Sequence, residues 1–237
     1  SSPDEIVFTS GGTESNNLVL KGVAYALKDK GNHIVTSTAE HYAVESPCRF
    51  LEKQGHRISF IPVDEFGIVK LDDLKKAITD ETILISIMYA NNETGTIGPI
   101  EEIAKIARET NIYFHTDAVQ AVGKVPVDVK KSGVDFLSLS GHKFYGPKGV
   151  GVLYIKKGTK ISSIQQGGHH ERNRRAGTEN VAGIVGLGKA ARIAKKELSG
   201  GNKRILKLRD RLYEGIKKRI KYIKLNGHPA RRLPNTL

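Results

Sequence analysis

The stretch SLSGHKFYGPKGVG, residues 138–151, places Lys143 among small and polar residues. The preceding VDFLSLS alternates apolar and polar positions, which predicts a half-buried strand, and a turn signal with a second apolar run follows. A lysine at the end of a strand is either a solvated loop cation, which is the commoner case, or an amine held in a site. The choice between the two depends on which other groups the chain brings near this amine.

A carboxylate ends another predicted strand. The stretch FHTDAVQ closes its strand on Asp117, and Gln120 follows one turn later. An aspartate in this place can simply cap the next helix. Together with a lysine it can also serve an aldehyde cofactor, because the amine holds the aldehyde as an imine. The carboxylate then keeps a pyridine nitrogen protonated, so that the ring takes up the electrons of a carbanion.

A third polar segment, TSGGTESNN, follows the first predicted strand and opens a helix. Gly11 and Gly12 let the backbone approach a ligand closely, and Thr13 adds a hydroxyl. The free N–H groups at a helix start favour an anion, most often phosphate, although a plain helix cap is about as common. The glycine spacing differs from those of the dinucleotide fingerprint and the P-loop. Phosphate cradle, aspartate and lysine together are the minimal set for pyridoxal phosphate.

The elements that must position these residues alternate between strand and helix. Apolar runs such as HIVTS and TILISIMYA predict strands, and amphipathic segments such as IEEIAKIARETN predict the helices between them. This alternation predicts an α/β fold with a mostly parallel sheet that is covered by helices on both faces. Ligands bind beyond the carboxyl ends of the strands in such sheets, and all three polar segments fall there.

Composition restricts the class of protein. The 237 residues are 38% hydrophobic and 27% charged, which is typical of a water-soluble globular protein, and no apolar run is long enough to cross a membrane. The single cysteine, Cys48, excludes an internal disulfide framework and fits a reducing compartment. We therefore expect a cytoplasmic protein that does not bind membranes.

The net charge of +13 has a local origin. Residues 1–188 carry equal numbers of acidic and basic side chains, whereas residues 189–232 carry 16 basic and 3 acidic ones. An apolar stripe in that region predicts a helix; its residues are Ile205, Leu208, Leu212, Ile216 and Ile220. We interpret the charges as a solvated helix face or a docking surface for an acidic protein. They lack the interleaved aromatic platform that a single-strand binder needs, so we expect no nucleic-acid partner.

Seven segments of the chain, in order, resemble the motifs of the cysteine desulfurases of the NifS/IscS type, which belong to the class V aminotransferase family. They are FTSGGTESNN, AEHYAV, NNETGTIGPI, HTDAVQAVGKVPVDV, SGHKFYGPKGVGVLYI, GGHHERNRRAGTENVAGIVGLGKA and LPNTL. The resemblance implies a seven-stranded sheet like that of aspartate aminotransferase, bound pyridoxal 5'-phosphate, and conversion of L-cysteine to L-alanine. The alternatives are a selenocysteine lyase, another class V lyase or aminotransferase, and a non-catalytic cofactor-binding or interaction module.

The resemblance also implies a role for each matching residue. Lys143 would form the Schiff base and move the α-proton, Asp117 would pair with the pyridinium nitrogen, and Gln120 would bond the phenolic oxygen. His41 would stack on the ring and shuttle protons, and Asn92 would meet the substrate side of the cofactor. The phosphate would be bound by Gly12, Thr13, Ser140 and His142. Thr178 would complete the phosphate site of the other subunit of a homodimer.

Further expectations concern sulfur and the ends of the chain. The chain opens without Met, and an apolar pattern begins at its end, so we expect an interior portion of a longer protein. The resemblance places the persulfide-forming cysteine beyond Leu237, with a sulfur-acceptor or iron–sulfur scaffold protein as partner. Cys48 sits among apolar helix neighbours and is predicted to be an inert, buried thiol.

Two further predictions concern metals and domains. The pair His169 and His170 cannot face one ligand point and has no cysteine beside it, so no metal site is predicted. We expect a cofactor-binding domain over residues 1–200. Residues 201–237 would form a linking helix and the start of a smaller domain.

Overall fold

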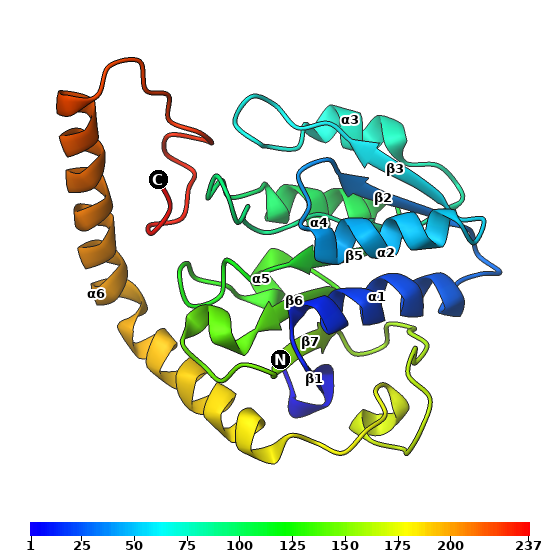
Figure 1. Cartoon of the computed structure of the whole chain (residues 1–237). Coiled ribbons are helices and arrows are strands. Elements are labelled where there is room, and N and C mark those ends of the chain that lie inside the picture. The colour runs from blue at the N-terminus through cyan, green and yellow to red at the C-terminus, as the bar shows by residue number, and fades with distance from the viewer.

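A computed structural model describes all 237 residues, and its centre is one seven-stranded sheet with the order β1-β7-β6-β5-β4-β2-β3 (Figure 1). The strands are β1 (Ile6–Thr9), β2 (His33–Ser37), β3 (Arg57–Ile61), β4 (Thr82–Ser86), β5 (Tyr113–Asp117), β6 (Phe136–Ser140) and β7 (Gly151–Ile155). Only β7 runs antiparallel to its neighbours β1 and β6, and all the other pairs are parallel. The predicted fold class, a mostly parallel seven-stranded sheet, is confirmed.

Helices cover both faces of the sheet. They are α1 (Gly12–Ala26), α2 (Tyr42–Glu52), α3 (Leu71–Ala77), α4 (Ile100–Glu109), α5 (Val129–Ser132) and α6 (Val181–Arg219), with short 3-10 turns η1 (Pro3–Glu5), η2 (Gly141–Phe144) and η3 (Glu171–Asn173). The helices α1 and α2 lie side by side on one face, whereas α3 and α4 pack on the other. Central strand β4 is buried at every position, as the nearly all-apolar run TILISIMYA predicts.

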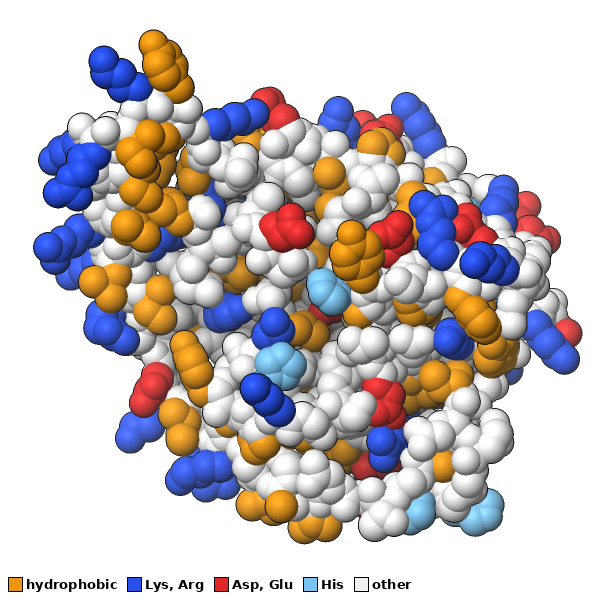
Figure 2. Space-filling view, in the orientation of Figure 1, with side chains coloured by type: hydrophobic (Ala, Val, Ile, Leu, Met, Phe, Trp, Pro, Cys, Tyr) orange, Lys and Arg blue, Asp and Glu red, His pale blue; other side chains and the backbone are white.

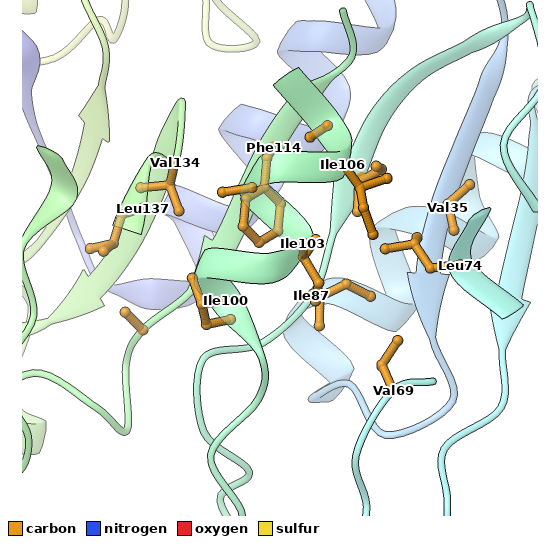
Figure 3. Packing of buried hydrophobic residues seen from close by; sticks show 14 of the residues in the cluster. Val35, Val69, Leu74, Ile87, Ile100, Ile103, Ile106, Phe114, Val134 and Leu137 are labelled. Carbon is orange, nitrogen blue, oxygen red and sulfur yellow. The ribbon is translucent and has the colours of Figure 1, made fainter. Parts of the chain in front are cut away.

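The packing of α4 shows how the sequence pattern builds one of the two apolar layers. Ile100, Ile103 and Ile106 recur every three residues, so they share one face of the helix, and all three are buried. Figure 3 shows this face directed toward Phe114 of β5, with Leu137 of β6 beside it. Glu101 and Glu102 occupy the first turn, where the helix dipole favours negative charge.

The layer on the opposite face holds the cysteine. Val44, Cys48 and Leu51 of α2 are all fully buried in one cluster with α1 and the sheet. The three residues recur at helical spacing, which is why they share the inward face. The prediction that Cys48 is a buried thiol on an apolar stripe is therefore confirmed.

The long helix α6 carries most of the basic excess. Its first part packs Leu187 and Ala190 against η2 and β7, whereas the residues of the predicted apolar stripe lie largely at the surface. Leu208 is 51% exposed and Leu212 is 57% exposed. Figure 2 shows hydrophobic side chains running along this helix between lysines and arginines. The helix is continuous through residue 200, so the domain division there stays a prediction. None of the helices is both long and apolar enough to span a membrane.

Candidate active site

A cavity of about 380 Å³ opens at the carboxyl edge of the sheet. Strands β2, β4, β5 and β6 are parallel, and β1 points the same way because β7 reverses direction on both sides of itself. The segments that leave these five strands therefore meet at one edge. Figure 2 shows a hollow near the centre of this face, with histidine and basic side chains around it.

Nine of the ten residues predicted for the site line this cavity. They are Gly12, Thr13, His41, Asn92, Asp117, Gln120, Ser140, His142 and Lys143. The tenth, Thr178, is exposed on the segment before α6 and does not line the cavity of its own chain. The structure thus brings together residues that are up to 131 positions apart in the sequence, namely Gly12 and Lys143. Their individual roles stay predictions.

Asp117 is the buried negative group of the site. It ends β5, its Oδ1 accepts the Val119 N–H at 2.9 Å, and its Oδ2 accepts the Asn16 side-chain N–H at 2.7 Å. Burial raises the pKa of Asp117, and these two hydrogen bonds together with the nearby His41 and Lys143 oppose that rise. No cationic side chain forms an ion pair with this carboxylate, so it remains available to a positive group on a ligand.

Asn16 was not predicted, although it holds this carboxylate. It is fully buried on the inward face of α1 and lines the cavity, and its Oδ1 has no hydrogen-bond partner. A buried amide oxygen without a donor is costly, which indicates a position built for a polar ligand or an ordered water. The signal in the sequence was an asparagine on the apolar face of a predicted helix.

An anion cradle lies at the start of α1. Gly11 is the N-cap and has no side chain, so the first N–H groups of the helix are free of a side-chain cap. A Cβ on Gly12 would stand 2.6 Å from the Val119 side chain, so only glycine allows this close approach. Across from the helix start, the Ser140 hydroxyl and His142 Nδ1 are 3.0 Å apart. These donors suit a phosphate.

The acidic residue of the same helix turn is neutralised by an ion pair. Glu14 accepts the Ser10 N–H at 2.7 Å, and the Arg175 Nε donates to its other oxygen at 2.7 Å. The guanidinium and the two hydrogen bonds hold the pKa of Glu14 below its usual range despite partial burial. This pair also ties the segment that carries Thr178 to the start of α1.

Lys143 is carried by η2, directly after β6. Its side chain is exposed and lines the cavity, and the turn ends on Tyr145, which has a left-handed backbone with φ of 66°. The amide N–H of Gly141 donates to Val150 O, so β6 and β7 fix the start of this turn. The rigid edge of the sheet therefore sets where the amine emerges.

His41 is the N-cap of α2. Its Nδ1 accepts the Ala43 N–H at 3.0 Å, so the neutral ring carries its proton on Nε2. This hydrogen bond orients the ring at the cavity. Asn92 is exposed at the mouth, and its neighbour Asn91 holds the loop in place by accepting the N–H groups of Glu93 and Thr94.

Glu40 is a second buried carboxyl that was not predicted. Its Oε1 accepts the Met88 N–H at 2.9 Å and the Ser37 hydroxyl at 2.7 Å, whereas its Oε2 is buried without a partner. Burial raises the pKa of Glu40 to about 8, and the charge of Asp117 adds to the rise. The residue follows a strand end and precedes His41, and this place in the sequence was the available signal.

The titration of Glu40 predicts how stability depends on pH. The folded protein keeps this proton up to about pH 8, whereas an unfolded chain releases it near 4.5, so this group lowers stability as pH rises between those values. The Glu40→Gln variant cannot titrate there, so we expect its free energy of unfolding to fall less steeply from about pH 5 to about pH 8. Urea unfolding at several pH values measures the slope. The exposed Glu93→Gln is the control, and equal slopes for wild type and Glu40→Gln would contradict the prediction.

The side chains that commonly ligate metals are spread apart in this structure. No group of three or more His, Cys, Asp or Glu residues is placed to hold a metal ion. His169 instead meets the Asn173 side chain at 2.7 Å.

Comparison with known proteins adds an independent observation. The family model described as aminotransferase class-V matches residues 1–237. The chain is 60% identical to "Cysteine desulfurase IscS" of Dictyoglomus turgidum over 99% of its own length and 59% of that protein. It is also 60% identical to "Cysteine desulfurase IscS" of Methanosarcina thermophila, over 99% of this chain and 58% of that protein. The chain thus spans about three fifths of the length of these relatives.

A solved structure gives the same result for the fold. The protein titled "NIFS-LIKE PROTEIN" superposes with a TM-score of 0.95 at 43% sequence identity, over 98% of this chain and 64% of that one. The resemblance that was drawn from seven motifs therefore extends over the whole chain, in sequence and in structure. With its family model matched from the first residue to the last, the chain belongs to the class V aminotransferase family.

Proposed function

We propose that this chain is the cofactor-binding part of a pyridoxal 5'-phosphate-dependent cysteine desulfurase. In this reaction L-cysteine becomes L-alanine, and its sulfur is transferred to an enzyme cysteine as a persulfide, for iron–sulfur cluster assembly or thiolation. The observation that carries the proposal is the content of one cavity. It combines a buried carboxylate without an ion-pair partner, a lysine amine and an anion cradle. The names of the relatives at 60% identity support the choice of substrate.

The residues present fit the proposed cofactor. The Asp117 carboxylate is buried and pairs with no cationic side chain, which suits a protonated ring nitrogen. The uncapped start of α1, with Thr13, Ser140 and His142, suits a phosphate. The unpartnered Asn16 Oδ1 is a further polar atom in the same cavity. When bound, pyridoxal phosphate supplies an electron sink for the pair left at the α-carbon.

Two residues move protons in this proposal. Lys143 anchors the cofactor through its amine and afterwards takes the substrate α-proton at Nζ, because its side chain lines the cavity from η2. His41 holds its ring proton at Nε2, since Nδ1 is engaged by Ala43. His41 can therefore relay a proton at Nε2 within the cavity.

Sulfur transfer needs an accessible thiol as well as this cavity. The substrate C–S bond breaks, and its electron pair stays with the carbon, which takes up the proton given up by the enzyme thiol and becomes the methyl group of alanine. The released sulfur keeps its own hydrogen and forms a bond to the enzyme cysteine sulfur, so that L-cysteine and a thiol become L-alanine and a persulfide. Cys48 does not meet the requirement, because it is fully buried, and burial with nearby Glu40 and Glu52 raises its pKa far above neutrality. The accepting cysteine is therefore proposed to be another residue of the full-length protein.

The Cys48→Ala variant distinguishes a packing role of this residue from a role as the sulfur-accepting nucleophile. We expect Cys48→Ala to leave the rate of alanine release within about twofold of wild type and to lower stability by about 1 kcal/mol, because a buried sulfur is lost from a packed layer. Alanine release from L-cysteine under a reductant measures the rate. Turnover abolished by this single change would show that Cys48 is the nucleophile.

The assembly and location belong to the same proposal. Thr178 is exposed and lies away from its own cavity, which supports a role in the phosphate site of a second copy in a homodimer. Its segment is tied to α1 through the Arg175–Glu14 pair. A sulfur-acceptor or scaffold protein is the proposed partner, and the single cysteine of this chain supports a reducing compartment such as the cytoplasm.

The test is to find where the cofactor is attached in the full-length protein. We expect visible absorbance after loading with pyridoxal phosphate, and borohydride reduction followed by peptide mapping is expected to label Lys143. Lys148 lies five residues further on in an exposed turn and serves as the internal control. A label on Lys148, or no label, would remove Lys143 from the role. Alanine release from L-cysteine then tests the reaction.

A further inference from the structure

The side chain of Gln120 is held by a neighbour that the proposed mechanism does not use. Lys124 Nζ donates to Gln120 Oε1 at 2.5 Å. The turns between β5 and α5 place the two side chains together, since Val122 N donates to Ala118 O and Lys124 N donates to Ala121 O. Gln120 lines the main cavity, whereas Lys124 lines a second one of about 160 Å³ beneath α6.

An ammonium group restricts the orientation of the amide it touches. Lysine carries three N–H donors and no acceptor, so only the oxygen of the Gln120 amide can face it. The other end of the amide, Nε2 with its two N–H groups, is then directed away from Lys124. A glutamine without such a neighbour can rotate its amide and present either end.

Lys124 is itself fixed in place. Its residue is half-buried, and its backbone carbonyl accepts a hydrogen bond from the Asn202 side chain of α6. Burial lowers the pKa of Lys124 to about 8, and the positive charge of Lys143 contributes. The charged groups that face it are Lys143 from η2 and Glu197 from α6. Its ammonium is therefore the main form at neutral pH, and its charge is lost as pH rises past about 8.

We propose that Lys124 is a positioning residue, whose ammonium orients the Gln120 amide so that its N–H groups face the cavity and donate to an acceptor on the bound ligand. Under the proposed function, on which this step rests, the acceptor is the phenolic oxygen of pyridoxal phosphate. The donated N–H stabilises negative charge on that oxygen. The role of Lys124 is thus exerted through Gln120, and it does not require contact with the ligand.

The first experiment needs no cofactor. In cofactor-free full-length protein with 15N-labelled glutamine side chains, the Gln120 resonance is identified by its loss in Gln120→Leu. We expect this resonance to titrate with a midpoint near pH 8 in the wild type and to be independent of pH between 7 and 9 in Lys124→Met. The Lys148→Met variant is the matched control and keeps the wild-type titration. A Gln120 resonance that ignores both pH and Lys124→Met would overturn the proposal.

The second experiment follows the loaded protein without substrate. We expect the pH midpoint of its visible absorbance to rise by about 0.5–1 unit in Lys124→Met, the size of one lost hydrogen bond, because the more negative form loses a donor. Lys124→Arg keeps a cation and is expected to restore the wild-type midpoint. Lys124→Met is expected to cause no further shift in a Gln120→Leu background, since the effect passes through that amide.

The outcomes separate this inference from the proposed function. If the protein develops no visible absorbance with pyridoxal phosphate, the proposed function fails, and the glutamine titration still decides the role of Lys124. If absorbance develops but its midpoint is the same in Lys124→Met, Lys124 has no positioning role, and the proposed function stands. Equal thermal unfolding midpoints for wild type and Lys124→Met would show that a shift does not come from general loss of structure.

Discussion

Lys143→Ala is expected to reduce the rate of alanine release from L-cysteine by about 10²–10⁴-fold, the factor that a positioned acid–base group contributes. The amine both anchors the cofactor and takes the α-proton in the proposed reaction, so its removal affects two steps. Because the Lys143 side chain is exposed, we expect the free energy of unfolding to change by no more than about 0.5 kcal/mol. A large loss of turnover with an unchanged fold is the predicted combination.

Full-length protein loaded with pyridoxal phosphate is needed for this measurement. Lys148→Ala is the matched control, since Lys148 lies in the same segment and does not line the cavity. We expect an added small primary amine to restore part of the rate in Lys143→Ala and to have no effect on the control. Near-normal turnover in Lys143→Ala would show that another amine carries the reaction.

The fold could be predicted from the sequence because its apolar patterns are unambiguous. The run TILIS in β4 is buried at every residue, and the three-residue spacing of isoleucines in α4 directs one face to the sheet. The place of the candidate site followed from the same alternation of strands and helices. The segments that follow parallel strands all emerge at one edge of the sheet. The exposure of Leu208 and Leu212 on α6 could not be predicted, because an apolar stripe does not reveal what covers it.

The site could be predicted only in part. Residues at strand ends, such as Asp117 and Lys143, are marked by their place after an apolar run, and the resemblance assigned their roles. Asn16 and Glu40 are not marked in this way, because each acts through a contact with a segment distant in sequence. Asn16 meets a residue 101 positions away, and Glu40 accepts an N–H from a residue 48 positions away. Such contacts exist only once the sheet has formed.

Asp117→Asn is expected to reduce turnover by about 10²–10³-fold, the loss typical of one preorganised electrostatic contact. A neutral amide cannot keep the proposed ring nitrogen protonated, so the ring loses its capacity to accept the electrons of the α-carbon. The variant keeps the shape of the side chain. Activity and stability are therefore expected to respond differently.

The fold should tolerate this change because of Asn16. The amide oxygen of the new side chain can still accept the Val119 N–H, and its NH₂ group then faces the Asn16 NH₂ group. If the Asn16 amide rotates, its unpartnered Oδ1 becomes the acceptor. The charge whose burial raises the pKa of Asp117 is also removed. We therefore expect the unfolding free energy of Asp117→Asn to equal or exceed that of the wild type.

Chemical unfolding and alanine release, measured on the same preparations, test this separation. The exposed Asp72→Asn serves as the control for loss of one negative charge. In an Asn16→Ala background the new amide has no acceptor, so there Asp117→Asn is expected to lower stability by about 1–3 kcal/mol, the cost of an unsatisfied buried donor. Near-normal turnover in the single variant would remove Asp117 from the proposed role. Equal stability effects in both backgrounds would show that Asn16 does not provide the compensating acceptor.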